Sequence, residues 1–145
     1  MSGDTFTVLV AGSGVMGRGI AGSFARAGLK TAVLSRNPDA VSGIDPGVAI
    51  LGSLPSQAPE LIIETIPEVI ELKHTLNGQI EEAYQGAAII GSNTSSLPLQ
   101  KLADKLKFPE KFCGIHYFQP ADITPIVEVA RVAQSQDATI ERALA

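Results

Sequence analysis

The sequence predicts an α/β fold in which a doubly wound, mainly parallel sheet carries helices on both faces. Short apolar runs rich in Val, Ile and Ala alternate along the chain with segments of helical periodicity. The first of these runs ends at a glycine cluster that leads directly into a helical pattern. Strands that are buried on both faces read as continuous apolar runs, and parallel strands are usually joined by helices.

The chain opens with a strand, a glycine turn and a helix. Residues 6–11 (FTVLVA) form the first apolar run. Met16, Ile20 and Phe24 then recur every four residues, and Gly28 can end that helix. Residues 31–34 (TAVL) predict the second strand.

The next segment, residues 35–59, contains four prolines and three glycines. Because Pro and Gly interrupt helices, we expect no long helix there, and only residues 48–51 have the pattern of a strand.

The remaining chain continues the alternation. Further strands are predicted at 61–65, 87–90, 112–118 and 126–131, and helices at 68–85 and 96–106, with another starting at 137. In the longer helix an apolar face is expected from Val69, Leu72, Leu76, Ile80 and Ala83. Acidic residues such as Glu81 lie mostly off that face.

Composition limits the classes of partner. The 145 residues are 45% hydrophobic and carry a net charge of −4, with no cluster of Lys or Arg, so we expect one domain and neither nucleic acid nor membrane as a partner. Cys113 is the single cysteine, which excludes an internal disulfide and a thiolate metal site. With that lone thiol, we expect no metal. No apolar run is long enough for a membrane span or signal peptide, so we expect a cytoplasmic protein.

Gly12, Gly14 and Gly17 form a G-x-G-x-x-G pattern between the first strand and its helix. In dinucleotide-binding proteins the first glycine permits a tight turn, the second lets the backbone approach a pyrophosphate, and the third allows close helix packing. Val15 and Met16 lie within the same loop and are candidate cofactor contacts. A purely structural turn is the alternative, but the strand and helix context favours a Rossmann-type nucleotide site.

The end of the second predicted strand bears on the choice of cofactor. An acidic residue there would bond the ribose 2′-hydroxyl of NAD, but this chain has Ser35 and Arg36. A hydroxyl followed by a guanidinium suits a 2′-phosphate, so NADP(H) is favoured and NAD(H) remains possible. Alternatively, Arg36 is an unliganded loop residue and Asp39 or Asp45 supplies the carboxylate.

Five segments, taken together and in order, resemble the NAD-binding domain of the L-3-hydroxyacyl-CoA dehydrogenases. They are residues 12–21 (GSGVMGRGIA), 64–73 (ETIPEVIELK), 92–97 (SNTSSL), 114–120 (GIHYFQP) and 126–129 (IVEV). The resemblance implies an oxidoreductase that transfers hydride between NAD(P) and a 3-hydroxyacyl or 3-hydroxy acid substrate. It also implies that residues 1–145 are the cofactor-binding domain. The helical domain that closes over the substrate and forms a homodimer in the family is absent from this chain, so we expect low activity.

Oxidation of a secondary alcohol needs a base, and histidine titrates near working pH. His116 and Glu128 lie on adjacent predicted strands, so the carboxylate can orient the imidazole. The resemblance implies that they form the catalytic pair. The alternative is a satisfied core histidine with a structural partner.

The resemblance implies three further roles. Ser95 would hydrogen-bond the substrate oxygen, with Asn93 in the same loop, and Glu68 and Lys73 would lie near the nicotinamide-side ribose. Alternatively, Ser95 and its neighbour cap the following helix, while Glu68 and Lys73 are a helix-end acid and a solvated base.

The chain departs from the family in three places. Ser35 replaces the usual aspartate, and Gln119 stands where the family has Asn. Residues 35–68 are too short for the helical hairpin that helps grip coenzyme A, so a smaller free 3-hydroxy or 3-oxo acid competes with a CoA thioester as substrate.

Two other functions remain open. One is an NADPH-dependent reductase similar to the β-hydroxyacid dehydrogenase and imine reductase group. That group relies on a catalytic lysine on a later helix and lacks the HYFQP and IVEV segments seen here. The other is a dinucleotide-binding module without turnover.

Overall fold

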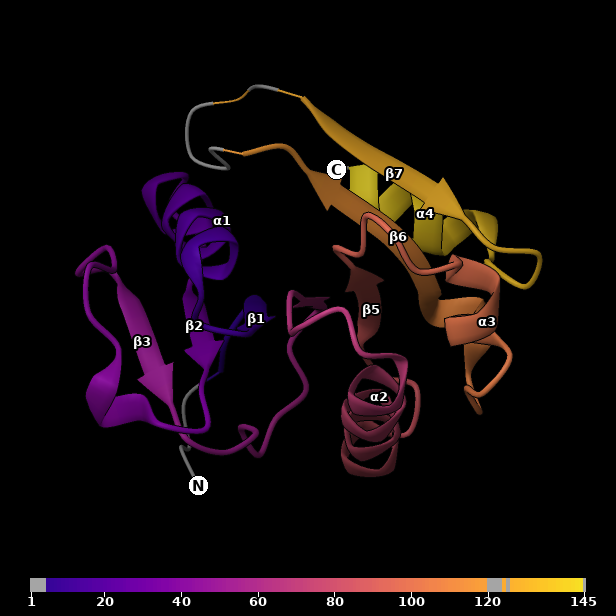
Figure 1. The fold of residues 1–145 in the computed structure, drawn as a ribbon, viewed down its shortest axis with the longest axis horizontal. Coiled ribbons are helices and arrows are strands. Elements are labelled where there is room, and N and C mark those ends of the chain that lie inside the picture. The colour runs from indigo at the N-terminus through magenta and orange to yellow at the C-terminus, as the bar shows by residue number, and fades with distance from the viewer. Residues whose placement is uncertain (1–4, 120–123, 125, 145) are drawn as a thin grey trace.

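A computed structural model describes residues 5–119, 124 and 126–144. The seven-stranded sheet has the order β3-β2-β1-β4-β5-β6-β7 (Figure 1). Its strands are β1 (Val8–Ala11), β2 (Thr31–Leu34), β3 (Val48–Leu51), β4 (Leu61–Glu64), β5 (Ile89–Ser92), β6 (Phe112–Tyr117) and β7 (Val127–Arg131). The strands from β1 to β6 pair in parallel, and β7 runs antiparallel to β6. The predicted mainly parallel α/β sheet is confirmed.

Helices cover both faces of the sheet, as predicted. They are α1 (Val15–Arg26), α2 (Ile70–Tyr84), α3 (Leu99–Ala103) and α4 (Asp137–Leu144), with 3₁₀ turns at Pro38–Ala40 and Pro109–Lys111. Val10 of β1 packs in one core with Ile20 of α1 and Ile140 of α4, whereas Leu9 packs in a second core with α2 and α3. Side chains alternate across a strand, so neighbouring residues of β1 serve opposite cores.

The position of β1 determines where a site can form. From β1 the chain builds outward through β2 to β3, then returns to place β4 on the other side of β1. The connections therefore diverge at the carboxyl ends of β1 and β4, and open α/β sheets bind ligands at such a point. The glycine loop lies there, at the start of α1.

The predicted apolar face of α2 is wrong in part. Val69, just before the helix, and Leu72 are both 44% exposed. The buried side of α2 instead contains Lys73, Asn77 and Glu81 beside Ile80 and Tyr84. Buried charges are tolerated where they are paired. Lys73 meets the carboxylates of Glu64 and Glu68, and Glu81 accepts the amides of Lys107 and Phe108.

Several boundaries differ from the prediction. The strand predicted at 87–90 spans Ile89–Ser92, because Gln85 and Gly86 adopt positive φ angles of 50° and 81° and reverse the chain first. The helix predicted at 96–106 is limited to Leu99–Ala103, with Pro98 at its N-cap. Pro120 and Ala145, which end a predicted motif and a predicted helix, lie outside the described residues.

Candidate active site

Two glycines of the first loop meet the requirements predicted for them, a tight turn at Gly12 and close packing at Gly17. Gly12 has a φ of +118°, and a side chain at Gly17 would overlap the Gly12 carbonyl. A Cβ on Gly14 would meet nothing within 4 Å, so this position leaves open space in front of the loop. Gly14 is the N-cap residue of α1, and no side chain caps the helix there. The first amides of a helix lack intrahelical partners, so the loop fits the pyrophosphate of a dinucleotide.

The end of β2 presents hydroxyls and a cation. The Ser35 hydroxyl accepts a hydrogen bond from the Asn37 amide at 3.1 Å and lies 3.2 Å from the Ser13 hydroxyl. Arg36 beside it is exposed. Asp45 is engaged elsewhere, because its carboxylate pairs with Arg26 at 3.5 Å and accepts the Gly47 amide at 2.8 Å.

A buried ion pair joins the end of β4 to α2. Glu64 ends β4, is fully buried and pairs with Lys73 of α2, which is also fully buried. Glu64 also accepts hydrogen bonds from the Ser92 hydroxyl at 2.6 Å and the Ile66 amide at 2.9 Å. The alternative interpretation of Lys73 as a solvated base is therefore wrong.

Glu68 connects this pair to the loop after β5. Its carboxylate lies 3.2 Å from the Lys73 ammonium and accepts the hydroxyls of Thr94 at 2.5 Å and Ser96 at 2.7 Å. Burial opposes ionisation, but these hydrogen bonds and the Lys73 charge lower the pKa of Glu68 to about 2. Glu68 is thus a carboxylate at neutral pH, and its side chain remains 38% exposed.

The loop after β5 places Asn93 and Ser95 between α2 and β6. The Asn93 side-chain carbonyl accepts the Tyr117 amide at 2.8 Å, and Ser95 is exposed. No side chain caps α3, and the Ser96 hydroxyl donates to Glu68 instead. The alternative interpretation of Ser95 and Ser96 as a helix cap is therefore wrong.

His116 and Glu128 face each other across the β6–β7 pair. They are register partners, so their side chains share one face of the sheet with Cβ atoms about 5 Å apart. The ring of His116 makes an edge contact with Phe118 at a centroid distance of 4.7 Å, and Glu128 is exposed. Both lie near the sheet edge that carries the glycine loop. The strand β6 runs parallel to β1 and His116 is its second-last residue, while Glu128 is the second residue of the antiparallel β7.

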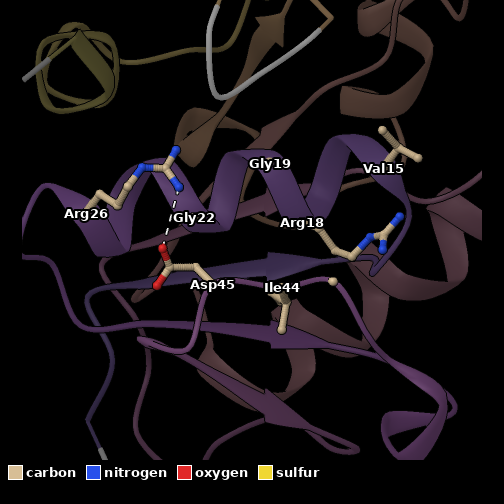
Figure 2. A pocket seen from close by; sticks show the side chains of 8 residues that line it. Val15, Arg18, Gly19, Gly22, Arg26, Ile44 and Asp45 are labelled. Atoms are coloured by element: carbon tan, nitrogen blue, oxygen red, sulfur yellow. Dashed lines mark ion pairs between the residues drawn. The ribbon is translucent and has the colours of Figure 1, made fainter.

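A cavity of about 460 Å³ lies between α1 and residues 43–45 (Figure 2). Residues 43–45 form its opposite wall, and the Arg18 guanidinium donates to the carbonyls of Ser42 at 2.7 Å and Gly14 at 3.3 Å. Of the residues that the sequence predicts to contact the cofactor, Val15 lines this cavity, and so does Asp45, the alternative source of a carboxylate. None of the residues lining the cavity belongs to β6 or β7, so the cavity is separate from the region of His116.

Sequence reasoning missed the supporting residues Glu64, Ser92, Thr94 and Ser96. Glu64 opens the 64–73 segment, and its place at the end of an apolar strand was the one available indication. Within the described ranges, no group of three or more His, Cys, Asp or Glu residues could hold a metal ion. Among the described helices, none has the length and apolar character needed to cross a membrane.

The family model for the NAD-binding domain of 3-hydroxyacyl-CoA dehydrogenase matches residues 7–49 and 54–145. The chain belongs to this family. This membership confirms the resemblance found in the sequence. It also confirms that the chain is a Rossmann-type NAD-binding domain of an oxidoreductase family.

Solved structures of three dehydrogenases or related proteins share this fold. The 3-hydroxyacyl-CoA dehydrogenase of Archaeoglobus fulgidus matches with a TM-score of 0.87 at 23% identity, over 96% of this chain and 51% of its own. M. tuberculosis FadB2 matches with a TM-score of 0.82 at 27% identity, over 97% of this chain and 59% of its own. The (S)-3-hydroxybutyryl-CoA dehydrogenase of Ralstonia eutropha matches with a TM-score of 0.82 at 26% identity, over 97% of this chain and 59% of its own. The chain thus spans between half and three fifths of these proteins.

Proposed function

We propose that the chain transfers hydride between NADP(H) and a 3-hydroxyacyl or 3-hydroxy acid substrate. The observation that carries this proposal is the direct pairing of His116 with Glu128 across β6 and β7, at the sheet edge that also holds the glycine loop. A base, its carboxylate partner and a nucleotide cradle at one edge are the groups that alcohol oxidation requires.

The proposed chemistry assigns one task to each side chain. When bound, the nicotinamide accepts a hydride from the substrate's carbinol carbon or returns it in reduction. A ring nitrogen of His116 takes the hydroxyl proton in oxidation and gives it back in reduction. Glu128 stabilises the resulting imidazolium, and the exposed Ser95 hydroxyl donates a hydrogen bond to the substrate oxygen.

The cofactor is proposed to bind along the carboxyl edge of the sheet. Gly12, Gly14 and Gly17 would cradle the pyrophosphate, with Val15 and Met16 beside it. The preference for NADP(H) is supported by the exposed Arg36 and by the Ser35 hydroxyl, and by the engagement of Asp45 with Arg26. NAD(H) binding through the same loop remains the alternative.

At the nicotinamide side, Glu68 and Asn93 are proposed to contact the cofactor. The Glu68 side chain is 38% exposed, and its carboxylate can accept hydrogen bonds from ribose hydroxyls. Lys73 has only 1% of its side chain exposed, so we propose that it acts through Glu68 rather than by direct contact.

The substrate is proposed to be a 3-hydroxyacyl thioester or a free 3-hydroxy acid. Between β2 and α2 the structure contains only a 3₁₀ turn, β3 and β4, and no helical hairpin. This supports the smaller acid. Residence in the cytoplasm and homodimerisation through a further domain are also proposed.

The chain's two histidines give a matched test of this mechanism. His116→Gln is expected to abolish formation of reduced nicotinamide from 3-hydroxybutyryl-CoA or 3-hydroxybutyrate while leaving cofactor affinity unchanged. His74→Gln, on α2, should alter neither. Equal rates for the chain and His116→Gln would reject the proposed base, and no turnover with either substrate would reject catalysis by this chain.

A further inference from the structure

Three charged side chains link β4, the start of α2 and the loop after β5. Glu64 and Lys73 are each fully buried, and Glu68 lies next to Lys73 with its side chain partly exposed. A buried ion pair is weak support for stability, because desolvation of both charges offsets their attraction. The pair therefore needs an explanation beyond packing.

The ammonium of Lys73 has no donor left for a ligand. It donates to a carboxylate oxygen of Glu64 and to the Ile66 carbonyl at 3.1 Å, and it lies 3.2 Å from Glu68. A lysine has three N–H donors, and three oxygens accept them here. The Lys73 ammonium thus lies between two carboxylates, the buried one of Glu64 and the partly exposed one of Glu68.

Glu68 passes this constraint to the loop after β5. One carboxylate oxygen faces Lys73, and the other accepts the Thr94 hydroxyl, the Ser96 hydroxyl and, at 3.3 Å, the Ser96 amide. Thr94 in turn accepts the Leu97 amide at 3.1 Å through its hydroxyl oxygen. Ser95 lies between the two residues that Glu68 holds.

We infer that Glu64 and Lys73 are positioning residues that act through Glu68 to set the loop carrying Ser95. Neither contacts substrate or cofactor. The inference rests on the proposed function only in taking Ser95 as the substrate-side hydroxyl. Cofactor hydroxyls that bind Glu68 would act on the same carboxylate, so this residue connects the two halves of the site.

The test removes both buried charges together, because loss of one would leave the other unpaired. In the Glu64→Gln/Lys73→Met variant, the Ser96 and Leu97 amides are expected to exchange with deuterium about tenfold faster or more, as for loss of a charge-assisted hydrogen bond. The pKa of Glu68, followed by carboxyl NMR, should also rise from about 2.

The matched control is Glu81→Gln, which alters a different buried glutamate, on α2. Glu81 accepts the Lys107 and Phe108 amides at 2.9 and 2.7 Å, so its loss destabilises the fold away from the loop. It should leave the titration of Glu68 and the relative exchange of the loop unchanged. The inference would be overturned if the double variant showed the same loop exchange rates and the same Glu68 pKa as this control.

A second variant applies where the double variant does not fold. Glu68→Gln keeps the buried pair and weakens its link to the loop, so Ser96 and Leu97 should again exchange about tenfold faster. Unchanged exchange would overturn the inference. Neither result depends on turnover, so the proposed function stands or falls separately through His116→Gln.

Discussion

Arg36 is an exposed side chain that follows the buried Ser35 at the end of β2. If it binds the 2′-phosphate, Arg36→Asp should weaken NADPH binding about tenfold or more and spare NADH, because a charge-assisted contact is replaced by repulsion. Calorimetric titration measures both affinities. Lys105→Asp, the same charge change at an exposed residue after α3, is the control, and unchanged NADPH affinity in Arg36→Asp would show that Arg36 is a bystander.

Cys113 lies fully buried in β6. Burial raises the pKa of its thiol to about 11, so little thiolate forms at neutral pH. We expect the native chain to resist alkylation by iodoacetamide and the urea-unfolded chain to react with one equivalent. Native alkylation at the rate of a free thiol would contradict this burial.

At the residue scale, local requirements were predictable and long-range pairings were not. The glycines of the first loop follow from turn geometry that the sequence displays within six positions. The burial of Lys73 depends on Glu64 and Glu68 meeting it in the folded chain, and neither periodicity nor spacing indicates that. The pairing of His116 with Glu128 was predictable because both lie on recognisable strands.

Two glycines of different elements give opposite predictions. Gly78 lies exposed within α2 with no atom near a built Cβ, so Gly78→Ala should raise the free energy of unfolding by about 0.5–1 kcal/mol. Gly17→Ala should lower it and weaken dinucleotide binding, since the added methyl meets the Gly12 carbonyl. Urea unfolding and cofactor titration of both variants test this, and equal effects would contradict the loop geometry.

The contacts that join α2 to the loop after β5 make stability depend on acid pH. The pKa of Glu68 falls from 4.5 to about 2 on folding, so its contribution is complete above pH 4.5 and is lost as pH falls toward 2. The difference in unfolding free energy between the chain and Glu68→Gln should therefore shrink over this interval. Urea unfolding at several pH values measures it, and a constant difference would contradict the assigned contacts.

Elements were predicted more reliably than their faces. The strands at 31–34 and 48–51 have the predicted bounds, because short apolar runs between Gly and Pro leave few alternatives. The buried face of α2 was wrong because Lys73 and Glu81 have polar partners on other elements. An apolar count cannot detect a buried polar group that is satisfied by a distant segment.

At the scale of the whole molecule, the connections determine the shape of the sheet. The helices α1, α2 and α3 lie in the connections β1–β2, β4–β5 and β5–β6, whose strands pair in parallel, whereas only nine residues, 118–126, separate β6 from β7. A crossover between adjacent parallel strands needs a dozen residues or more, so the adjacent strands β6 and β7 pair antiparallel, which brings Glu128 opposite His116.

The most direct test of the account is a calorimetric titration of the chain with NADPH and, separately, NADH. We expect one molecule to bind per chain, with NADPH the tighter ligand and binding weakened in Gly17→Ala. Equal or tighter binding of NADH would contradict the role assigned to Ser35 and Arg36. Absence of binding by either nucleotide would contradict the central claim that the loop between β1 and α1 is a dinucleotide site.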